Sequence, residues 1–230
     1  GSYVASAWTP YVIAHANSQL YGWVGFFVMG FTLQHHMPEP ARMAQFLRLC
    51  RFSLIAMIAG VALRFAAEPL VAVNHEVGIG LGVSSACLQL ASILAFIVNV
   101  SVARRDLTEL TWQTSFIFAS LAYLVCVAFA EPIYFVASHG NEIQSVQAIA
   151  HWAPILRDAQ FLGFVANMIF GVSLIRLSKC FGFRPPSKAF GMLGFALWNG
   201  GLLLRMTGWN VYFGSFLSSD LEGRYAMPSY

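Results

Sequence analysis

Charged side chains are scarce in this sequence: only 10% of its residues are Asp, Glu, Lys or Arg, against 58% hydrophobic residues. A soluble domain carries about 25% charged residues, because its surface faces water. The chain therefore has too little charge to cover a water-soluble surface. Its formal net charge of +3 is small and the basic residues are dispersed, so we expect no nucleic acid partner.

The sequence also lacks the motifs of common soluble enzymes. No nucleophile elbow, P-loop, HExxH or dinucleotide-binding glycine motif occurs, so hydrolase, kinase and dehydrogenase functions have no support. None of the four cysteines forms a CxxC pair, so neither a zinc site nor a disulfide framework is indicated. The first apolar run contains His15 and Asn17 and is too long for a signal peptide, so we expect it to be a mature helix.

Long apolar runs rich in aromatic residues are what the sequence has instead. The 20 Phe, 8 Tyr and 6 Trp suit contact with lipid and with its interfaces. A bilayer-spanning helix needs about 20 mostly apolar residues. Segments that meet this requirement, separated by short polar connections, are residues 11–33, 52–71, 77–102, 112–136, 152–177 and 189–213. The sequence predicts an all-α integral membrane protein, a bundle of six transmembrane helices forming one domain over residues 1–230.

The charges of the connections predict the orientation of this bundle. The first, third and fifth connections are basic, with Arg42, Arg48, Arg51, Arg104, Arg105, Lys179, Arg184 and Lys188. The second and fourth hold no Lys or Arg, and are flanked by Glu68, Glu76, Glu131 and Glu142. Because cytoplasmic loops carry the excess of Lys and Arg, both termini should lie outside. We expect a multi-pass protein of the cell inner (plasma) membrane with both termini in the periplasm.

Two parts of the sequence resemble each other at an offset of 141 residues, as from Gln19 to Gln160. The same offset pairs Gly22 with Gly163, Gly60 with Gly201, Leu63 with Leu204 and Arg64 with Arg205. The register holds across two predicted helices and the connection between them. Helices 1–2 and 5–6 are therefore predicted to be copies of one helix hairpin, as is common in membrane proteins.

Ionisable groups inside a bilayer are costly, and each indicates a functional site. In the predicted topology most of them fall near the outer face: His15, His75, His139, His151, Arg64, Arg157, Asp158 and Arg205. Below His15, the residues Gln19, Gly22, Phe26 and Gly30 follow at helical spacing. A histidine above a glycine-lined stripe allows haem to lie against the helix with an axial imidazole. Alternatively, the glycines only permit close helix packing.

The second ligand of such a haem is open between His151 and His75, with His151 slightly preferred. His151 starts helix 5, the counterpart of helix 1, whereas His75 lies at the outer end of helix 3. Arg64 and Arg205 occupy equivalent positions and are candidates for binding an anion such as a haem propionate. Alternatively, Arg64 pairs with Glu68 one turn away, and Arg205 extends to the interface or stacks on Trp209.

Several stretches resemble the NnrS-type membrane proteins, which contain haem and copper, are linked to nitric oxide tolerance and are distantly similar to subunit I of haem-copper oxidases. Residues 15–30, HANSQLYGWVGFFVMG, are similar to their first conserved helix. Those similar to their second are residues 157–164 (RDAQFLGF), 168–176 (MIFGVSLIR) and 181–186 (FGFRPP). The resemblance implies a half-length relative that holds a b-type haem on His15. The family also contains copper. The second copy of the helix hairpin, however, has Leu156 and Asp158 where a histidine ligand is expected.

The sequence thus predicts a haem b protein with His15 and His151 as metal ligands, serving electron transfer or nitric oxide and oxygen chemistry near the periplasmic face. Its partners are the lipid bilayer and a redox partner or additional membrane subunits. The alternative is a quinol-binding or structural anchor subunit of a larger respiratory complex. A small-solute transporter is favoured by the repeat, but the sequence shows no Pro- or Gly-broken helix pair in both copies.

Overall fold

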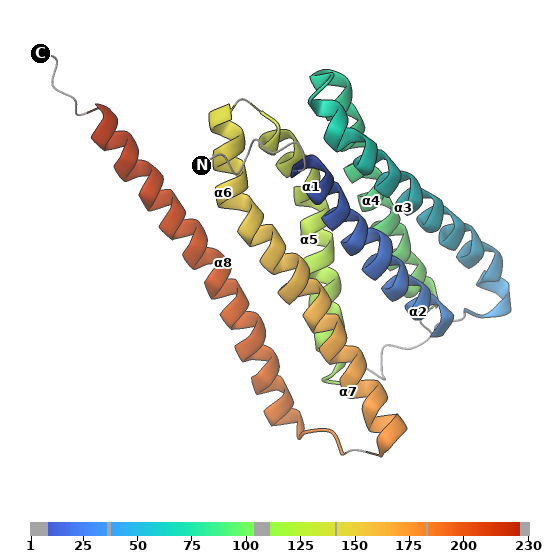
Figure 1. Ribbon diagram of the computed structural model, residues 1–230. Helices are drawn as coiled ribbons and strands as arrows, with labels where there is room; N and C mark the ends of the chain where they lie inside the picture. The colour runs from blue at the N-terminus through green and yellow to red at the C-terminus, as the bar shows by residue number, and fades with distance from the viewer. Residues whose placement is uncertain (1–8, 36–37, 104–110, 141, 183, 226–230) are drawn as a thin grey trace, which may run out of the picture. The chain divides into compact units, whose positions relative to one another are not determined.

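The computed structural model describes residues 9–35, 38–103, 111–140, 142–182 and 184–225. Within these ranges every regular element is a helix, which confirms the all-α prediction for this part of the chain. In chain order they are α1 (Thr9–Asn17), η1 (Ser18–Gly25), α2 (Phe26–His35), η2 (Pro40–Arg42), α3 (Met43–Val71), α4 (His75–Ala103), α5 (Thr114–Ser138), α6 (Glu142–Asp158), η3 (Ala159–Ala166), α7 (Asn167–Phe181) and α8 (Lys188–Tyr225). Figure 1 shows α1, η1 and α2 as one unbroken rod, and α6, η3 and α7 as another.

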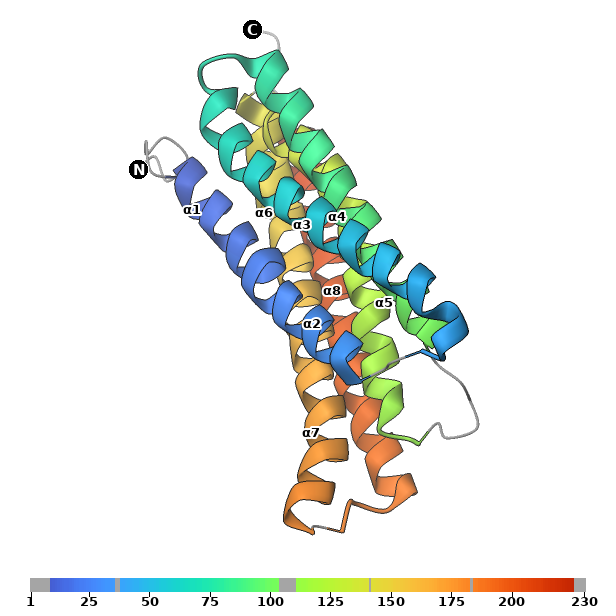
Figure 2. The same ribbon diagram turned by 90° about the vertical axis from the view of Figure 1, so that its right-hand side faces the viewer.

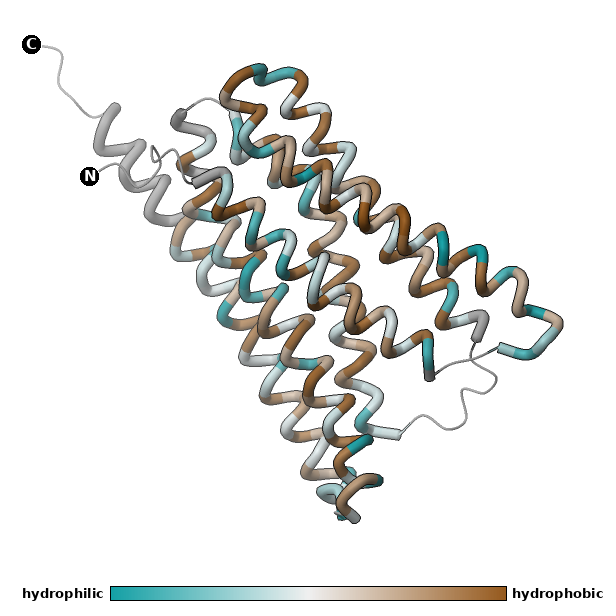
Figure 3. Tube along the Cα trace, turned by 45° about the vertical axis from the view of Figure 1, so that its right-hand side comes forward, coloured by the Kyte–Doolittle hydropathy of each residue, from teal (hydrophilic) through white to brown (hydrophobic). Residues whose placement is uncertain are grey.

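Helices of the described part are long and apolar enough to cross a membrane, which fits a multi-pass membrane protein. Four stretches meet this condition by length and composition: Pro40–Val71, His75–Ser101, Thr114–Ser138 and Ala148–Phe181. Figure 3 shows that hydrophobic residues dominate these helices and that hydrophilic residues are scattered along them. The stretches match the second to fifth predicted spans. The rod α1–η1–α2 and helix α8 correspond to the first and sixth.

Several helices extend beyond their predicted bounds. Helix α3 begins at Met43 rather than at residue 52, and α8 runs on to Tyr225 rather than ending at residue 213. The prediction counted apolar residues and so found the part that suits lipid, whereas helical hydrogen bonding continues through flanking polar residues. The predicted end of the second span at residue 71 agrees with the end of α3 at Val71, and Pro69 lies inside its last turn.

The contacts between helices divide the chain into two compact units. The first, which we call unit 1, comprises residues Gly1–Leu110 and Leu124–Val146, and unit 2 comprises Thr111–Tyr123 and Gln147–Tyr230. Unit 1 thus holds the first rod, the α3–α4 hairpin and the C-terminal part of α5. Unit 2 holds the N-terminal part of α5, most of the second rod, and α8.

Helices α3 and α4 pack along their whole length through small and polar residues, and both Figure 1 and Figure 2 show them side by side. The residues buried on each helix recur at alternating spacings of four and three, as in a left-handed helix pair. On α3 they include Phe46, Ser53, Met57, Gly60, Arg64 and Ala67, and on α4 Gly78, Gly82, Ser85, Gln89, Ser92, Phe96 and Asn99. Small residues let membrane helices approach closely, and polar ones bond across the interface.

Hydrogen bonds join the two helices at several levels. Ser53 Oγ donates to the Ser92 carbonyl at 2.9 Å, and Ser92 Oγ donates to the Ser53 carbonyl at 2.6 Å. Nearer the α3–α4 turn, Ser85 Oγ donates to the carbonyl of Gly60 at 2.5 Å. A Cβ at Gly60 would lie 2.8 Å from Gln89 Cγ, so glycine is what allows this approach.

Each rod contains a π-helical segment at its centre. The first, η1, spans Ser18–Gly25, and the second, η3, spans Ala159–Ala166. Their starts are 141 residues apart (159 minus 18), and so are their ends (166 minus 25). This is the offset that relates the two similar parts of the sequence. π-Helical turns are rare and occur often at functional sites.

Candidate functional site

Arg64 and Glu68 lie one turn apart near the C-terminal end of α3, inside unit 1. Arg64 Nε donates to Glu68 Oε1 at 2.9 Å, and the two side chains are only 3% and 0% exposed. The spacing i, i+4 brings such side chains together on a helix. Buried ions are costly unless they are paired, so the buried arginine requires this or another carboxylate nearby.

A second carboxylate approaches the same guanidinium from α5. Arg64 Nη1 lies 3.6 Å from Glu131 Oε2, and the Glu131 side chain is 6% exposed. One turn further along α5, the ring of Phe135 faces the guanidinium, with its centroid 4.3 Å from Arg64 Cζ, a cation–π geometry. A Cβ at Gly82 of α4 would overlap this ring, so the glycine makes room for it. Two carboxylates therefore share one guanidinium.

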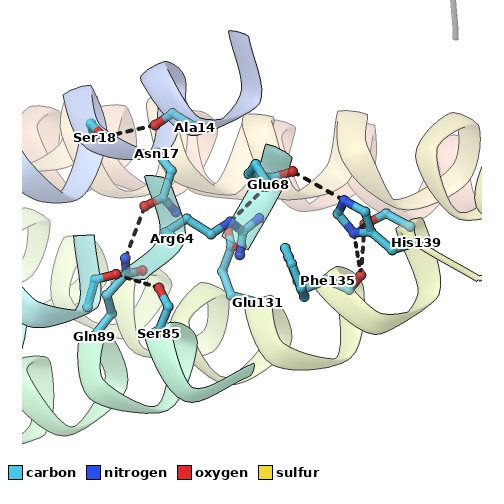
Figure 4. Close-up of polar contacts among 12 residues, drawn as sticks. Ala14, Asn17, Ser18, Arg64, Glu68, Ser85, Gln89, Glu131, Phe135 and His139 are labelled. Atoms are coloured by element: carbon cyan, nitrogen blue, oxygen red, sulfur yellow. Dashed lines mark hydrogen bonds and ion pairs between the residues drawn. The ribbon is translucent and has the colours of Figure 1, made fainter. Parts of the chain in front are cut away.

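His139, directly after α5, contacts the other oxygen of Glu68. Its Nε2 lies 3.2 Å from Glu68 Oε2, and its Nδ1 lies 2.8 Å from the Phe135 carbonyl. Its side chain is 17% exposed, more than those of the other three residues. We call Arg64, Glu68, Glu131 and His139 the Arg64 cluster; Figure 4 shows them converging from α3 and α5.

The contacts of His139 indicate where its protons lie. Nδ1 of His139 lies 2.8 Å from the Phe135 carbonyl and 3.2 Å from Ser138 Oγ; because a carbonyl oxygen only accepts hydrogen bonds and a hydroxyl can accept one as well, a hydrogen on Nδ1 satisfies both contacts. In the neutral ring, Nε2 would then present a lone pair to a carboxylate oxygen of Glu68. Two lone pairs repel each other, so the contact is attractive only when a further proton lies on Nε2 or on Glu68.

Polar side chains continue from the cluster along the interior of unit 1. Gln89 Nε2 donates to Asn17 Oδ1 at 3.0 Å, which ties α4 to the residue that precedes η1. Figure 4 shows Asn17, Gln89 and Ser85 on one side of Arg64, and Phe135 and His139 on the other. These uncharged groups are bonded to one another or to backbone, as membrane helix interfaces require.

The predicted ligand His15 lies on the exposed side of α1, and no other described residue hydrogen-bonds to it. The stripe predicted below it is not straight, because the π-helical turns of η1 are wider than 3.6 residues. Buried positions here recur every four residues, at Asn17, Tyr21, Gly25 and Met29. Gly22 is half-buried, and a Cβ there would meet Val61 of α3 at 3.8 Å, an ordinary packing distance.

The predicted second ligands occupy different places. His75 belongs to unit 1 and is exposed, and its Nε2 donates to the carbonyl of His139 at 2.8 Å. His151 belongs to unit 2, where its Nε2 lies 2.5 Å from Asn210 Oδ1 and its ring stacks on Trp152 and Phe213. Among the described residues, no group of three or more His, Cys, Asp or Glu side chains is placed to hold a metal ion.

Arg205 resembles Arg64 in sequence position but not in environment. Its Nε donates to Asp158 Oδ2 at 2.6 Å, and its side chain is 67% exposed. Arg157, next to this pair, bonds Gln160 at 2.6 Å. Nearby, Trp209 Nε1 donates to the carbonyl of His151 at 3.1 Å, and is thus bonded to the second rod rather than stacked on Arg205.

No family model, curated protein or solved structure matches this chain. Its resemblance to NnrS-type proteins therefore stays a prediction.

The sequence predicted Arg64 and its partner Glu68 but missed Glu131 and His139 as members of the same site. The sequence indicates only that His139 is one of several outer histidines and that Glu131 flanks a connection. A signal was present: Glu68-Pro69 and Glu131-Pro132 repeat one dipeptide near the C-terminal ends of two apolar helices. Since alternate loops lie on one side of the membrane, the predicted topology places the two glutamates at similar depth.

Proposed function

We propose that this multi-pass membrane protein takes up and releases one proton at the Arg64 cluster. The observation that carries the proposal is the contact between His139 Nε2 and Glu68 Oε2 at 3.2 Å, in which the other ring nitrogen already donates to a carbonyl. This contact needs one proton beyond those of the neutral imidazole and the ionised carboxylates. Ionisable groups within membrane spans typically belong to proton relays or ion pathways.

The net charge of the Arg64 cluster also supports the uptake of one proton. One guanidinium faces two carboxylates, so these four side chains together carry one net negative charge when His139 is neutral. An unpaired buried ion costs several kcal/mol, even after the protein relaxes around it. One added proton, on the imidazole or on a carboxylate, makes the cluster neutral. The neutral form therefore holds one more proton than the form with both glutamates ionised.

The exposed fractions indicate the route of this proton. His139 is 17% exposed, whereas Glu68, Arg64 and Glu131 are 0%, 3% and 6% exposed. Imidazole is the side chain best suited to exchange protons near neutral pH. His139 is thus the group that exchanges with solvent, and Glu68 receives the proton from it.

The side of the membrane follows from the predicted topology. We propose that α1–η1–α2 and α8 also cross the bilayer, giving six spans with both termini outside. The absence of Lys and Arg from the α3–α4 connection and from residues 139–142 supports this orientation. His139 would then exchange protons with the outer, periplasmic side.

Infrared difference spectroscopy of the protein in lipid nanodiscs, recorded across pH, tests the proposal. We expect a protonated-carboxyl or imidazolium signal that is removed by Glu68→Gln and altered by His139→Gln. The matched control is Asp158→Asn, which removes the carboxylate of the exposed ion pair in unit 2. The proposal fails when no group of the cluster changes protonation at any pH at which the protein stays folded.

A second candidate function, haem binding at His15, is favoured by one observation. The His15 imidazole is exposed, and no described residue hydrogen-bonds to it. An exposed imidazole of this kind suits the axial ligation of haem iron. Within unit 1, His75 and His139 are engaged with backbone and with Glu68. Unit 1 therefore offers His15 as an axial ligand for a haem, which would supply chemistry with nitric oxide or oxygen. For copper, the described residues contain no group of three or more His, Cys, Asp or Glu side chains placed to hold the ion.

A further inference from the structure

The carbonyl group of His139 lies just beyond the C-terminal end of α5, which ends at Ser138. The main chain here is held to the helix only by long bonds. His139 N donates to the Val136 carbonyl at 3.3 Å, and Gly140 N donates to the Ala137 carbonyl at 3.4 Å. Carbonyl groups at the end of a helix need donors from elsewhere. The position of the His139 imidazole therefore depends on the group that donates to the His139 carbonyl.

His75 provides this donor. Its Nε2 lies 2.8 Å from the carbonyl oxygen of His139, and both residues belong to unit 1. Because a carbonyl oxygen only accepts hydrogen bonds, Nε2 of His75 must carry a hydrogen in this contact. The bond joins the first residue of α4 to the residue that follows α5.

The part of the α3–α4 hairpin that carries His75 is itself firmly held. The side chain of Asn74 caps the start of α4, because its Oδ1 accepts a hydrogen bond from Val77 N at 3.3 Å. A Cβ at Gly78 would lie 2.5 Å from a backbone nitrogen of α3, so the two helices are in close contact next to their turn. His75 thus extends from a rigid base toward the end of α5.

We propose that His75 is a positioning residue of the Arg64 cluster, which keeps the His139 imidazole against Glu68 and so sets the pH at which the cluster takes up its proton. This inference rests on the proposed function. The α3–α4 hairpin holds His139 at two points, its carbonyl through His75 and its ring through Glu68. The contact of the ring with Glu68 is attractive only when the extra proton is present, so a bond that keeps this contact closed favours the protonated form. Without the bond from His75, the cluster should take up its proton at a lower pH.

The charged and titratable groups around His139 come from three helices. The other members of the Arg64 cluster are Arg64 and Glu68 of α3 and Glu131 of α5. On α4, His75 bonds the His139 carbonyl, and Glu76 follows in the first turn and is exposed. A protonated His75 would oppose proton uptake by the cluster through its own positive charge. The effect of the hydrogen bond is therefore isolated by comparing two uncharged replacements of His75.

His75→Gln and His75→Met form the matched pair for this test. The two new side chains have nearly the same shape, but only Gln has an N–H that can replace that of the His75 Nε2. The pH dependence of the ¹⁵N signal of His139 Nε2, recorded on the full chain in lipid nanodiscs, gives the midpoint of proton uptake. We expect the midpoint of His75→Met to lie about 0.5–1 pH unit below that of His75→Gln, the shift that corresponds to one hydrogen bond.

Equal midpoints in the two variants overturn the role of His75, and the proposed function stands when the natural protein still titrates. When the natural protein shows no titration at the Arg64 cluster, the proposed function fails and the role of His75 fails with it.

The tautomer of His75 tests the same hydrogen bond in the natural protein, and it decides the matter when a variant does not fold. Nitrogen NMR should show that the neutral His75 ring carries its hydrogen on Nε2, the atom that lies 2.8 Å from the His139 carbonyl. A neutral ring with its hydrogen on Nδ1 could not donate to this carbonyl and overturns the inference.

Discussion

Removing the positive charge of the Arg64 cluster should destabilise the protein, and removing a neighbouring negative charge should then restore part of the loss. At an effective dielectric constant of about 20, the Coulomb attraction of Arg64 is about 6 kcal/mol to Glu68 at 2.9 Å and about 5 kcal/mol to Glu131 at 3.6 Å. Breaking a buried ion pair by removing one partner costs about 3–5 kcal/mol. We therefore expect Arg64→Gln to lower the free energy of unfolding by about 3–5 kcal/mol.

The second substitution, Glu131→Gln, tests whether the cluster carries one negative charge in excess. The test is whether this substitution raises or lowers the free energy of unfolding. In the natural protein, Glu131→Gln removes the less closely bound carboxylate and should cost about 1 kcal/mol or less, because it also removes the excess negative charge. In the Arg64→Gln background the same substitution removes a carboxylate that has lost its ion pair with Arg64. There it should stabilise by about 1–3 kcal/mol, the range of coupling energies between residues in one network.

Reversible unfolding in mixed micelles, titrated with a denaturing detergent, gives the four free energies of this double-mutant cycle. Arg205→Gln is the control, because Arg205 is 67% exposed and its loss should leave stability close to that of the natural protein. The reasoning is refuted when Glu131→Gln destabilises the Arg64→Gln protein by as much as it destabilises the natural one. Additive costs would mean that Arg64 and Glu131 do not share one electrostatic site.

Three further predictions follow from the packing, the topology and the second candidate function. Gly82→Ala should lower the free energy of unfolding by about 1–3 kcal/mol in the same assay, because its Cβ overlaps the Phe135 ring. Gly80→Ala, with open space at its Cβ, should not lower it. Equal losses of stability in the two variants would contradict the packing around Phe135. An impermeant thiol reagent should label Cys180 only from the cytoplasmic side and a cysteine at position 142 only from outside; the reverse pattern would invert the orientation. When the purified protein shows a Soret band, His15→Ala should remove or strongly shift it; an unchanged spectrum excludes His15 as a haem ligand.

The α-helical fold could be predicted from the sequence because apolar length and scarcity of charge determine which segments suit lipid. The second to fifth spans match long apolar helices for this reason. Helix ends could not be predicted as well. Helix α3 begins among exposed charges such as Arg48 and Arg51, where hydropathy carries no information about backbone hydrogen bonds.

The candidate site could be predicted only in part, because its members come from different helices. The spacing of Arg64 and Glu68 is local, so their pairing was among the predicted alternatives. Glu131 and His139 reach Arg64 and Glu68 from α5, and a contact between residues more than 60 positions apart has no periodicity to reveal it. The stripe below His15 was predicted with the ordinary helical period, which a π-helical segment does not keep.

Nitrogen NMR of the His139 ring, in protein labelled with ¹⁵N-histidine and held in lipid, tests the proton site most directly. The His139 signals are assigned by their loss in His139→Gln. The account predicts that Nδ1 stays protonated at every pH, because it donates to the Phe135 carbonyl, and that the Nε2 signal changes with pH and is displaced by Glu68→Gln. A ring that carries its single hydrogen on Nε2, or an Nε2 signal that does not respond to pH or to Glu68→Gln, would contradict the account.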